Sequence, residues 1–236
     1  MKILVTGSNG QLGRELQRAV PSEWSVTAIG TADCDITDSA AVATLIEGLR
    51  PDVVVNCAAY TAVDKAEMER ETADAVNWHA VENLARVAAS VDAALVHIST
   101  DYVFDGESHK PYGESDPTAP INHYGAGKLQ GEKAIAASGC RGVVIRTQWL
   151  YSSYGKNFVK TMLRLAEQQR EVRVVADQRG CPTAADDLAA TIVAILPAVV
   201  ADRTLRGEAF HFPSSDEATW CESAEEISPV AERDSP

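Results

Sequence analysis

The chain has 236 residues, of which 45% are hydrophobic, and its formal net charge is −13 at pH 7. This length and apolar content suffice for one sizeable α/β domain with an appended lobe, or for two small domains. The excess of acidic residues excludes a surface for nucleic acid or for anionic membranes, because both partners are negatively charged. A nucleotide ligand stays open, since a helix N-terminus and a few local cations can hold phosphates.

The five cysteines are scattered along the chain, and no two of them form a CxxC pair. This pattern predicts free thiols in a reducing cytoplasm, with neither a disulfide framework nor a metal site. The N-terminus passes from Met1 and Lys2 straight into an apolar run, and no apolar stretch is long enough to cross a bilayer. We therefore expect a cytoplasmic protein.

Short apolar runs alternate with amphipathic stretches through the first 147 residues. The runs predict buried strands at 2–6, 24–29, 51–56, 94–100 and 142–146. The stretches between them predict helices at 11–20, 40–49, 73–90 and 124–137, the second of them capped by Asp38. Strands that alternate with helices indicate an α/β fold, a Rossmann-type doubly wound parallel sheet with right-handed crossovers.

The pattern changes after residue 147. A helix at 158–168, a short strand at 172–175 and a helix at 186–196 are predicted, and we expect 185–200 to pack back on the first domain. The segments 148–184 and 201–220 then form a small second lobe. Residues 221–236 are acidic, contain two prolines and show no convincing periodicity, which predicts a disordered tail.

Three glycines, Gly7, Gly10 and Gly13, follow the first predicted strand and open the first helix. The first permits a tight turn, the second lets a pyrophosphate approach the backbone, and the third lets helix and strand pack closely. The helix N-terminus adds unpaired N–H groups and a partial positive charge. Their position after a strand favours a dinucleotide site over an ordinary turn, so residues 1–147 are predicted to bind NAD(P).

The end of the second predicted strand bears on the choice between NADH and NADPH. Residues 30–31 are Gly-Thr, where an acidic residue would take the 2′-hydroxyl of NAD. The sequence leaves two interpretations open for each of two nearby charged residues. Asp33 either reaches the ribose or is a solvated loop acid. Arg14 either pairs with a 2′-phosphate or is a solvated helix residue. Asp35 and Ile36 are candidates to contact the adenine. We expect both cofactors to be used.

Tyr124 and Lys128 lie four residues apart on one predicted helix, and Thr100 ends the strand before it. A phenol has a pKa of about 10, and an adjacent ammonium group favours the tyrosinate and brings that pKa toward neutrality. The Thr100 hydroxyl can hold a substrate oxygen against the phenol. Taken separately, Tyr124 and Lys128 also fit an ordinary pair on a helix surface, and Thr100 also fits a residue whose hydroxyl caps the backbone. Their order after the glycine turn predicts a nicotinamide-dependent carbonyl reductase.

The chain resembles the extended short-chain dehydrogenase/reductases, and more closely the dTDP-4-dehydrorhamnose reductase family. The resemblance covers residues 2 to about 220, and it is most specific at 58–67 and 99–106. The other matching stretches are 7–13, 50–56, 124–128, 131–132, 146–151, 157–166 and 177–183.

The resemblance implies roles for particular residues. Tyr124 would donate the proton to the C4 oxygen of the sugar, Lys128 would bind the nicotinamide ribose, and Thr100 would hydrogen-bond the carbonyl. The implied cofactor contacts are Gly7, Gly10, Gln11, Leu12, Gly13, Asp35, Ile36, Ala59, Tyr60, Thr61, Tyr124 and Lys128. The implied substrate contacts are Val63, Thr100, Asp101, Tyr102 and Trp149, the last of which would otherwise be a core aromatic. No metal ligand is implied, although Mg²⁺ accompanies some family members.

For the chain as a whole, the resemblance implies NADPH- or NADH-dependent reduction of dTDP-4-dehydro-6-deoxy-L-mannose to dTDP-L-rhamnose, by a monomer or homodimer. Two alternatives stay open: a reductase of another nucleotide-linked 4-keto sugar, and a non-catalytic NAD(P)-binding regulatory homologue. The likeness fades after Trp220. We therefore expect a shortened chain with an incomplete substrate lobe and weakened substrate binding.

Overall fold

A computed structural model describes residues 1–168 and 171–233 of the chain. Its centre is a six-stranded sheet in the order β2-β1-β3-β4-β5-β9, and every pairing in it is parallel. The predicted doubly wound parallel fold is therefore confirmed, with β9 as a strand that the sequence analysis missed. The strands are β1 (Lys2–Thr6), β2 (Ser25–Ile29), β3 (Val53–Asn56), β4 (Ala94–Thr100), β5 (Gly142–Thr147) and β9 (Glu208–His211).

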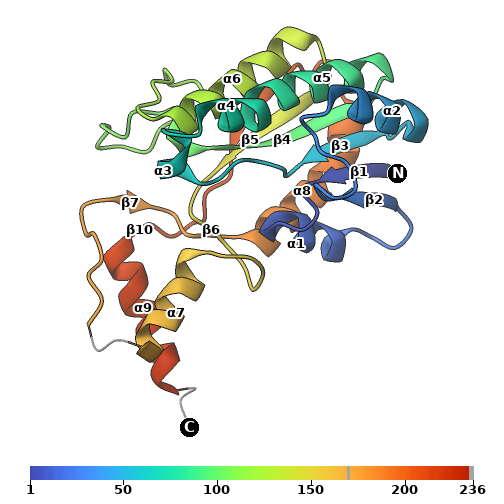
Figure 1. The fold of residues 1–236 in the computed structure, drawn as a ribbon. Helices are drawn as coiled ribbons and strands as arrows, with labels where there is room; N and C mark the ends of the chain where they lie inside the picture. The colour runs from blue at the N-terminus through green and yellow to red at the C-terminus, as the bar shows by residue number, and fades with distance from the viewer. Residues whose placement is uncertain (169–170, 234–236) are drawn as a thin grey trace.

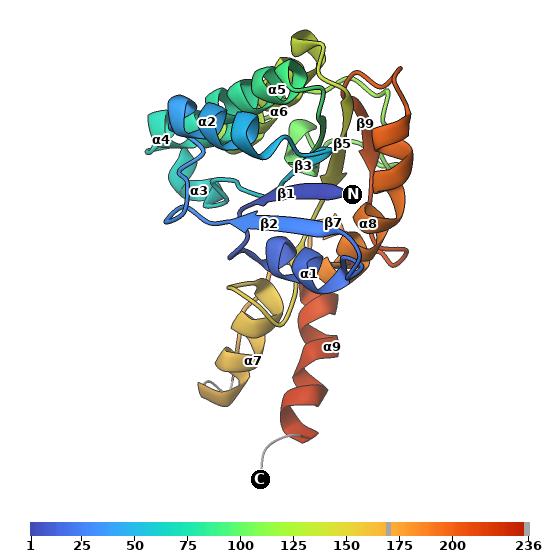
Figure 2. The ribbon, with the colours of Figure 1, turned by 90° about the vertical axis from the view of Figure 1, so that its right-hand side faces the viewer.

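Helices cover both faces of this sheet (Figures 1 and 2). On one face, Leu4, Val54 and Leu95 pack against α2 (Ser39–Leu49), α5 (Ala80–Ser90) and α6 (His123–Ser138). On the other face, the intervening residues Ile3 and Val55 pack against α1 (Gln11–Ala19) and α8 (Ala185–Ala201). Because successive strand residues point to opposite faces, runs that are wholly apolar suit a sheet buried on both sides.

The strand order reverses between β1 and β3, which lie side by side with Thr6 opposite Asn56. In open α/β sheets, ligands bind outside the carboxyl ends of the strands at such a reversal. Gly7 follows β1 there, and Thr100 ends β4 at the same edge of the sheet. The fold thus gathers the predicted cofactor turn and the predicted catalytic hydroxyl at one edge.

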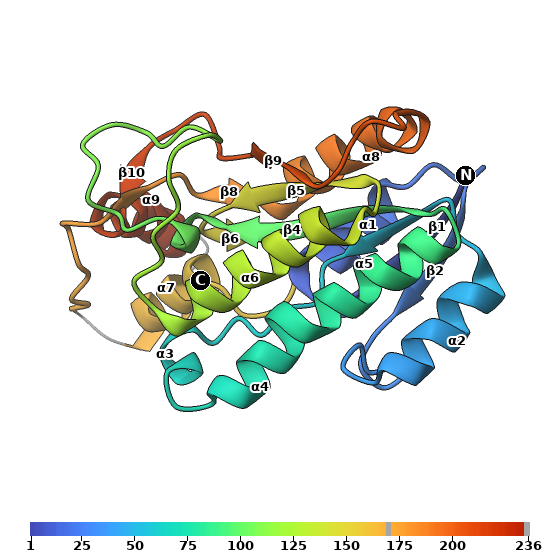
Figure 3. The same ribbon diagram turned by 90° about the horizontal axis from the view of Figure 1, so that it is seen from above.

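The long helix predicted at 73–90 is built from three consecutive helical segments. These are α4 (Arg70–Asp74), a π-helical turn (Ala75–His79) and α5, and α5 runs beside α6 over the sheet (Figure 3). A π-helical turn inserts one residue into the helix and is frequent at functional sites. It places Asn77, which is 1% exposed, toward the segment that follows β3.

A smaller lobe lies below the carboxyl edge of the sheet (Figure 1). It contains α7 (Phe158–Gln168) and α9 (Trp220–Arg233), which pack against each other. Two short pairings join it to the rest: β6 (Leu150–Tyr151) with β8 (Thr183–Ala184), and β7 (Arg179–Gly180) with β10 (Ala218–Thr219). One further short helix, α3 (Val63–Ala66), follows β3.

Two expectations for the second lobe are corrected. Residues 220–233 form α9, where a disordered tail was predicted over 221–236; residues 234–236 lie outside the described residues. The positions of α9 that line the pocket are Trp220, Glu222, Ser223, Glu226 and Ile227, so two carboxylates and a serine interrupt the apolar pattern. The strand predicted at 172–175 is irregular chain, and Val175 is 52% exposed.

Gly142, the first residue of β5, has a φ of 155°, and a Cβ there would collide with the carbonyl oxygen of Leu95 on β4. We expect Gly142→Ala to lower the free energy of unfolding by about 2–4 kcal/mol, since neither backbone can move without breaking the ladder. The matched control is Gly48→Ala in α2, where an added Cβ meets nothing within 4 Å.

Gly48→Ala should raise the free energy of unfolding by roughly 0.5–1 kcal/mol, because alanine favours helix. Urea denaturation monitored by circular dichroism measures both changes. Equal effects of the two substitutions would contradict this account of the β4–β5 contact.

Candidate functional site

The turn between β1 and α1 is shaped for a group that must come close to the backbone. Gly7 has a φ of 67°, and a Cβ on it would lie 2.6 Å from the backbone nitrogen of Ala58. A Cβ on Gly13 would collide with the carbonyl oxygen of Gly7. At the N-terminus of α1, Gly10 supplies no side-chain cap. The first N–H groups of α1 can therefore bind an anionic group, which fits a pyrophosphate.

The smaller lobe forms hydrogen bonds with this same terminus of α1. The side chain of Gln11 donates to the carbonyl of Leu150 over 3.4 Å and accepts from the Asn157 side chain at 2.8 Å. Gly155 packs against the Gln11 side chain, where an added Cβ would lie 3.0 Å away. The first residue of α1 thus contacts the segment that leads from β6 to α7.

Asn77 holds the segment after β3, which contains the predicted cofactor residues Ala59, Tyr60 and Thr61. Its side-chain oxygen accepts from the Tyr60 N–H at 2.9 Å, and its side-chain nitrogen donates to the Tyr60 carbonyl at 3.0 Å. The sequence analysis missed Asn77. Its signal was a polar residue inside an alanine-rich helix, which has to find a buried partner.

The loop after β2 has its acidic side chains engaged locally. The Asp33 carboxylate accepts from the Gly30 N–H at 2.8 Å, and that of Asp35 accepts from the N–H and the hydroxyl of Thr37 at 2.9 and 2.8 Å. Ile36 is buried in the core on the α2 side of the sheet. Arg14 donates to the Asn9 carbonyl at 3.3 Å and lies over the ring of Tyr154.

Thr100, Asp101, Tyr102 and Tyr124 come together at the end of β4. The Thr100 hydroxyl donates to the Asp101 carboxylate at 3.0 Å and accepts from the Tyr102 N–H at 3.2 Å. The ring of Tyr124, on the first turn of α6, meets the ring of Tyr102 edge to face at 5.7 Å. The Asn122 side chain caps α6 by accepting from the Gly125 N–H at 2.7 Å, which fixes that first turn.

The phenol of Tyr124 is a weaker acid in this site than a phenol in water. Burial raises its pKa to about 12, and the hydrogen bond with the Thr100 hydroxyl acts in the opposite direction. The expected lowering of that pKa by Lys128 is not found, because burial dominates. Tyr124 therefore holds its proton at neutral pH, which suits a proton donor.

Lys128 lies on α6 one turn after Tyr124 and is 2% exposed. Its Nζ donates to the Ile98 carbonyl at 2.6 Å and lies 3.3 Å from Nε2 of His97. Burial lowers the pKa of Lys128 to about 8, while Glu132 and Cys57 act in the opposite direction. Glu132 is itself paired with Arg146 at 2.7 Å, so Lys128 has no carboxylate of its own.

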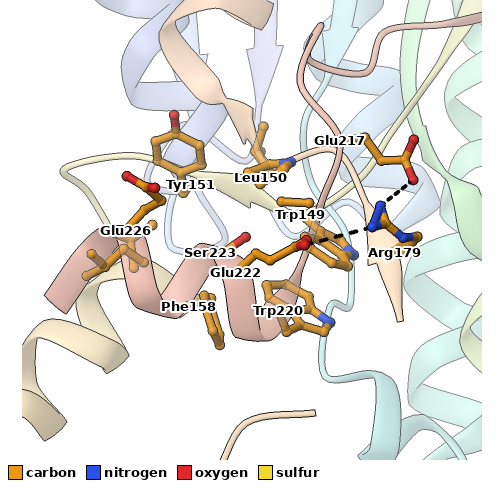
Figure 4. A pocket seen from close by; sticks show the side chains of 14 residues that line it. Trp149, Leu150, Tyr151, Phe158, Arg179, Glu217, Trp220, Glu222, Ser223 and Glu226 are labelled. Carbon is orange, nitrogen blue, oxygen red and sulfur yellow. Dashed lines mark hydrogen bonds and ion pairs between the residues drawn. The ribbon is translucent and has the colours of Figure 1, made fainter. Parts of the chain in front are cut away.

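A pocket of about 590 Å³ opens between α7 and α9 (Figure 4). Trp149 lies in its wall with a φ of 49°, and its indole stacks on that of Trp220 with ring centroids 3.5 Å apart. Phe158 flanks Trp220, and Arg179 forms ion pairs with Glu217 and Glu222 at the rim. Trp149 is thus a pocket wall, but none of Thr100, Tyr124 and Lys128 lines this pocket.

Two segments connect the pocket to the end of β4. Gly180 packs beneath Trp149, and the adjacent thiol of Cys181 is close enough to Asp101 for that carboxylate to raise its pKa, after burial and Glu217. On the other side, the helix α3 that begins at Val63 brings Asp64 close enough to raise the pKa of Tyr102, after burial and Asp101. These effects place α3 and the segment around Cys181 near the end of β4.

Two other properties follow from the described part of the chain. No group of three or more His, Cys, Asp and Glu residues within 1–168 and 171–233 is placed to hold a metal ion, so these side chains do not support Mg²⁺. In the same residues, none of the helices has the length and apolar character needed to traverse a bilayer. The cysteines at 34, 57, 140, 181 and 221 are free thiols.

Comparisons with known proteins give one consistent family. The sequence model of the RmlD substrate binding domain matches residues 1–235. The chain is 44% identical over 229 residues to a dTDP-4-dehydrorhamnose reductase of Sinorhizobium fredii (strain NBRC 101917 / NGR234), which covers 96% of this chain and 77% of that protein. The likeness thus extends past Trp220, where it was expected to fade.

Solved structures of dTDP-4-dehydrorhamnose reductases superpose closely on the structure of this chain. The dTDP-4-dehydrorhamnose reductase of Clostridium acetobutylicum matches with a TM-score of 0.93 at 40% identity, over 100% of this chain and 82% of that one. The reductase of Bacillus anthracis, which was solved in complex with NADP, matches with a TM-score of 0.92 at 38% identity, over 98% and 80% of the two chains.

Burial raises the pKa of Asp101 from 3.8 to about 6, against the hydrogen bond from Thr100. A carboxyl whose pKa is raised by folding stabilises the fold below its unfolded pKa and loses that contribution as pH rises through the folded one. We expect Asp101→Asn to be more stable than the parent at pH 7, by at most about 3 kcal/mol, and equally stable below about pH 4.

Thermal unfolding of both proteins across this pH range measures the difference. The matched control is Asp92→Asn at the surface, where Arg203 and Arg141 lower the pKa of the carboxyl, so that its removal at pH 7 brings no gain. A stability difference that does not change with pH would contradict the raised pKa of Asp101.

Proposed function

The chain belongs to the dTDP-4-dehydrorhamnose reductase family, and we propose that it reduces the C4 carbonyl of dTDP-4-dehydro-6-deoxy-L-mannose to give dTDP-L-rhamnose, with NADPH or NADH as cofactor. One observation carries the proposal beyond family membership. A half-buried phenol with a raised pKa, Tyr124, meets the Thr100 hydroxyl at the edge of the sheet where the glycine turn opens. The free thiols of the chain agree with a cytoplasmic setting for this reaction.

The cofactor is held by backbone rather than by charge. Gly7, Gly10 and Gly13 leave room for a pyrophosphate, and the N–H groups at Gln11 and Leu12 face it. Residues 59–61, fixed by Asn77, border the nicotinamide half, and the backbone of 35–36 borders the adenine. Lys128 holds the ribose next to the nicotinamide.

When bound, the cofactor supplies the hydride that adds to the C4 carbon. Thr100 hydrogen-bonds the carbonyl oxygen, and Tyr124 donates its proton to that oxygen as negative charge develops there. The raised pKa of Tyr124 matches this order of events, because the phenol must keep its proton until the alkoxide forms. Asp101 positions Thr100 by accepting a hydrogen bond from its hydroxyl in the resting site.

The sugar lies along the path between α3 and the Trp149 wall. Val63 and Tyr102 border it near the phenol, and Asp101 lies below it. Trp149 offers a flat apolar face, stacked on Trp220 and therefore fixed in place. The same contacts would serve another nucleotide-linked 4-keto sugar, so a panel of such sugars belongs in the assay.

We expect Tyr124→Phe to lower kcat by about 10²–10⁴-fold while the Kd for NADPH changes by less than about threefold, because only the transferable proton is lost. Stopped-flow absorbance of NADPH oxidation and fluorescence titration measure the two quantities. The matched control is Tyr112→Phe, which removes a phenol that donates to Asp105 in a loop. A Tyr124→Phe rate within a few-fold of the parent would remove Tyr124 from the mechanism. Cofactor binding without turnover of any sugar in the parent would favour the regulatory homologue.

We also expect less than about a hundredfold discrimination between NADPH and NADH, roughly 2.7 kcal/mol. The physical reason is that Asp33 is engaged by the Gly30 N–H and Arg14 by the Asn9 carbonyl, so neither is free to select for the ribose hydroxyl or the 2′-phosphate. Fluorescence titration with each cofactor measures the ratio. A larger ratio, lost in Arg14→Ala, would show instead that Arg14 leaves its contact to bind a 2′-phosphate.

A further inference from the structure

A continuous line of buried polar side chains runs behind the site, through the interior of the sheet. Thr6, Asn56, His97 and Lys128 come from β1, β3, β4 and α6, and each is at most 2% exposed. Thr6 Oγ1 donates to Asn56 Oδ1 at 2.5 Å, Asn56 Nδ2 lies 3.0 Å from His97 Nδ1, and His97 Nε2 lies 3.3 Å from Lys128 Nζ. The proposed reaction does not use the first three residues directly.

The orientation of the Asn56 amide is fixed by the backbone. The Ala58 N–H points at Asn56 Oδ1 from 3.2 Å, and an N–H group can only donate. The Asn56 atom that faces Ala58 must therefore be the oxygen. It follows that the amide nitrogen, which can only donate, is the atom that faces His97 Nδ1.

This orientation selects one tautomer of His97. A donor at Nδ1 requires a lone pair on Nδ1, so the neutral imidazole carries its proton on Nε2. Burial lowers the pKa of His97 well below 6.5, which agrees with a neutral ring. The Nε2–H group then faces Nζ of Lys128.

An ammonium group has three protons and no lone pair, whereas a neutral amine has two protons and one lone pair. Lys128 already donates to the Ile98 carbonyl. Facing Nε2–H, only the neutral amine can complete both hydrogen bonds. We propose that His97 is a positioning residue that donates from Nε2 to Lys128 and thereby favours the neutral amine over the ammonium in the cofactor-free protein; its bearing on catalysis rests on the function proposed above.

The other titratable groups that act on Lys128 oppose this effect. Glu132 on α6 and Cys57 after β3 both raise its pKa, and Arg146 balances the charge of Glu132. Burial outweighs them and brings the pKa of Lys128 to about 8. A lysine held between amine and ammonium can take up or release a proton at working pH, which a permanently charged lysine cannot do.

Two measurements on the cofactor-free protein test the proposal. Long-range ¹H–¹⁵N spectra of histidine-labelled protein separate the two neutral tautomers from the imidazolium, and substitution of the other four histidines one at a time assigns His97. We expect the Nε2–H tautomer of His97 throughout pH 6–9. An Nδ1–H tautomer, or an imidazolium in this range, would overturn the proposal even if no variant of His97 folds.

The second measurement is the pKa of Lys128, followed by NMR of ¹³C-labelled lysine in the parent and in His97→Gln. The glutamine amide can rotate to present its oxygen to Lys128, so the titration should move to higher pH by about one pH unit or more. His211→Gln, the matched control on β9, removes a histidine that lies beside Arg146 and should leave the titration in place. An unchanged titration in folded His97→Gln would overturn the proposal. Since neither measurement uses cofactor or sugar, an inactive protein with the expected tautomer would contradict the proposed function alone.

Discussion

The close approach of the turn after β1 to the segment after β3 is the constraint on which the site depends. There is no room for a side chain between Gly7 and Ala58. At the same place the Ala58 N–H donates to the side chain of Asn56, two residues earlier, and so determines how that amide faces His97. The same proximity leaves the N-terminus of α1 open beside residues 59–61. Backbone packing at one crossing therefore sets both the cofactor cradle and the polar line behind it.

The sequence predicted the sheet and most helices because their signals are local. Short apolar runs such as 51–56, flanked by turn residues, are typical of buried strands. The spacing of the three glycines is typical of the turn that joins the first strand of such a sheet to its helix. The connections that matter at the site are not local. Asn77 reaches back 17 residues to Tyr60, and His97 meets Asn56 across 41 residues. A single polar residue in an apolar element signals a buried partner, but it does not say which residue that partner is. The helix α9 was missed for a related reason, since the apolar face of a helix is recognisable only when most of its positions are apolar.

Burial, more than neighbouring charge, governs the ionisation of the site. The interpretation of Tyr124 and Lys128 from sequence considered only their neighbourhood on one helix, where an ammonium group four residues away lowers the pKa of a phenol. In the structure Lys128 is buried and Tyr124 is half-buried, and burial shifts the pKa of each group in the direction of its neutral form. Burial disfavours the charged form of each group. The two residues lie one turn apart on α6, as their spacing predicts, but that spacing carried no information on the depth at which they lie.

Gln11 has two separate attachments at the start of α1. Its backbone belongs to the helix terminus, while its side chain joins both Leu150 and Asn157 in the segment that leads to the lobe. The residue after Trp149 and the residue before α7 therefore both contact the first residue of α1. A group that binds at the glycine turn would thus lie next to a side chain that also contacts the lobe.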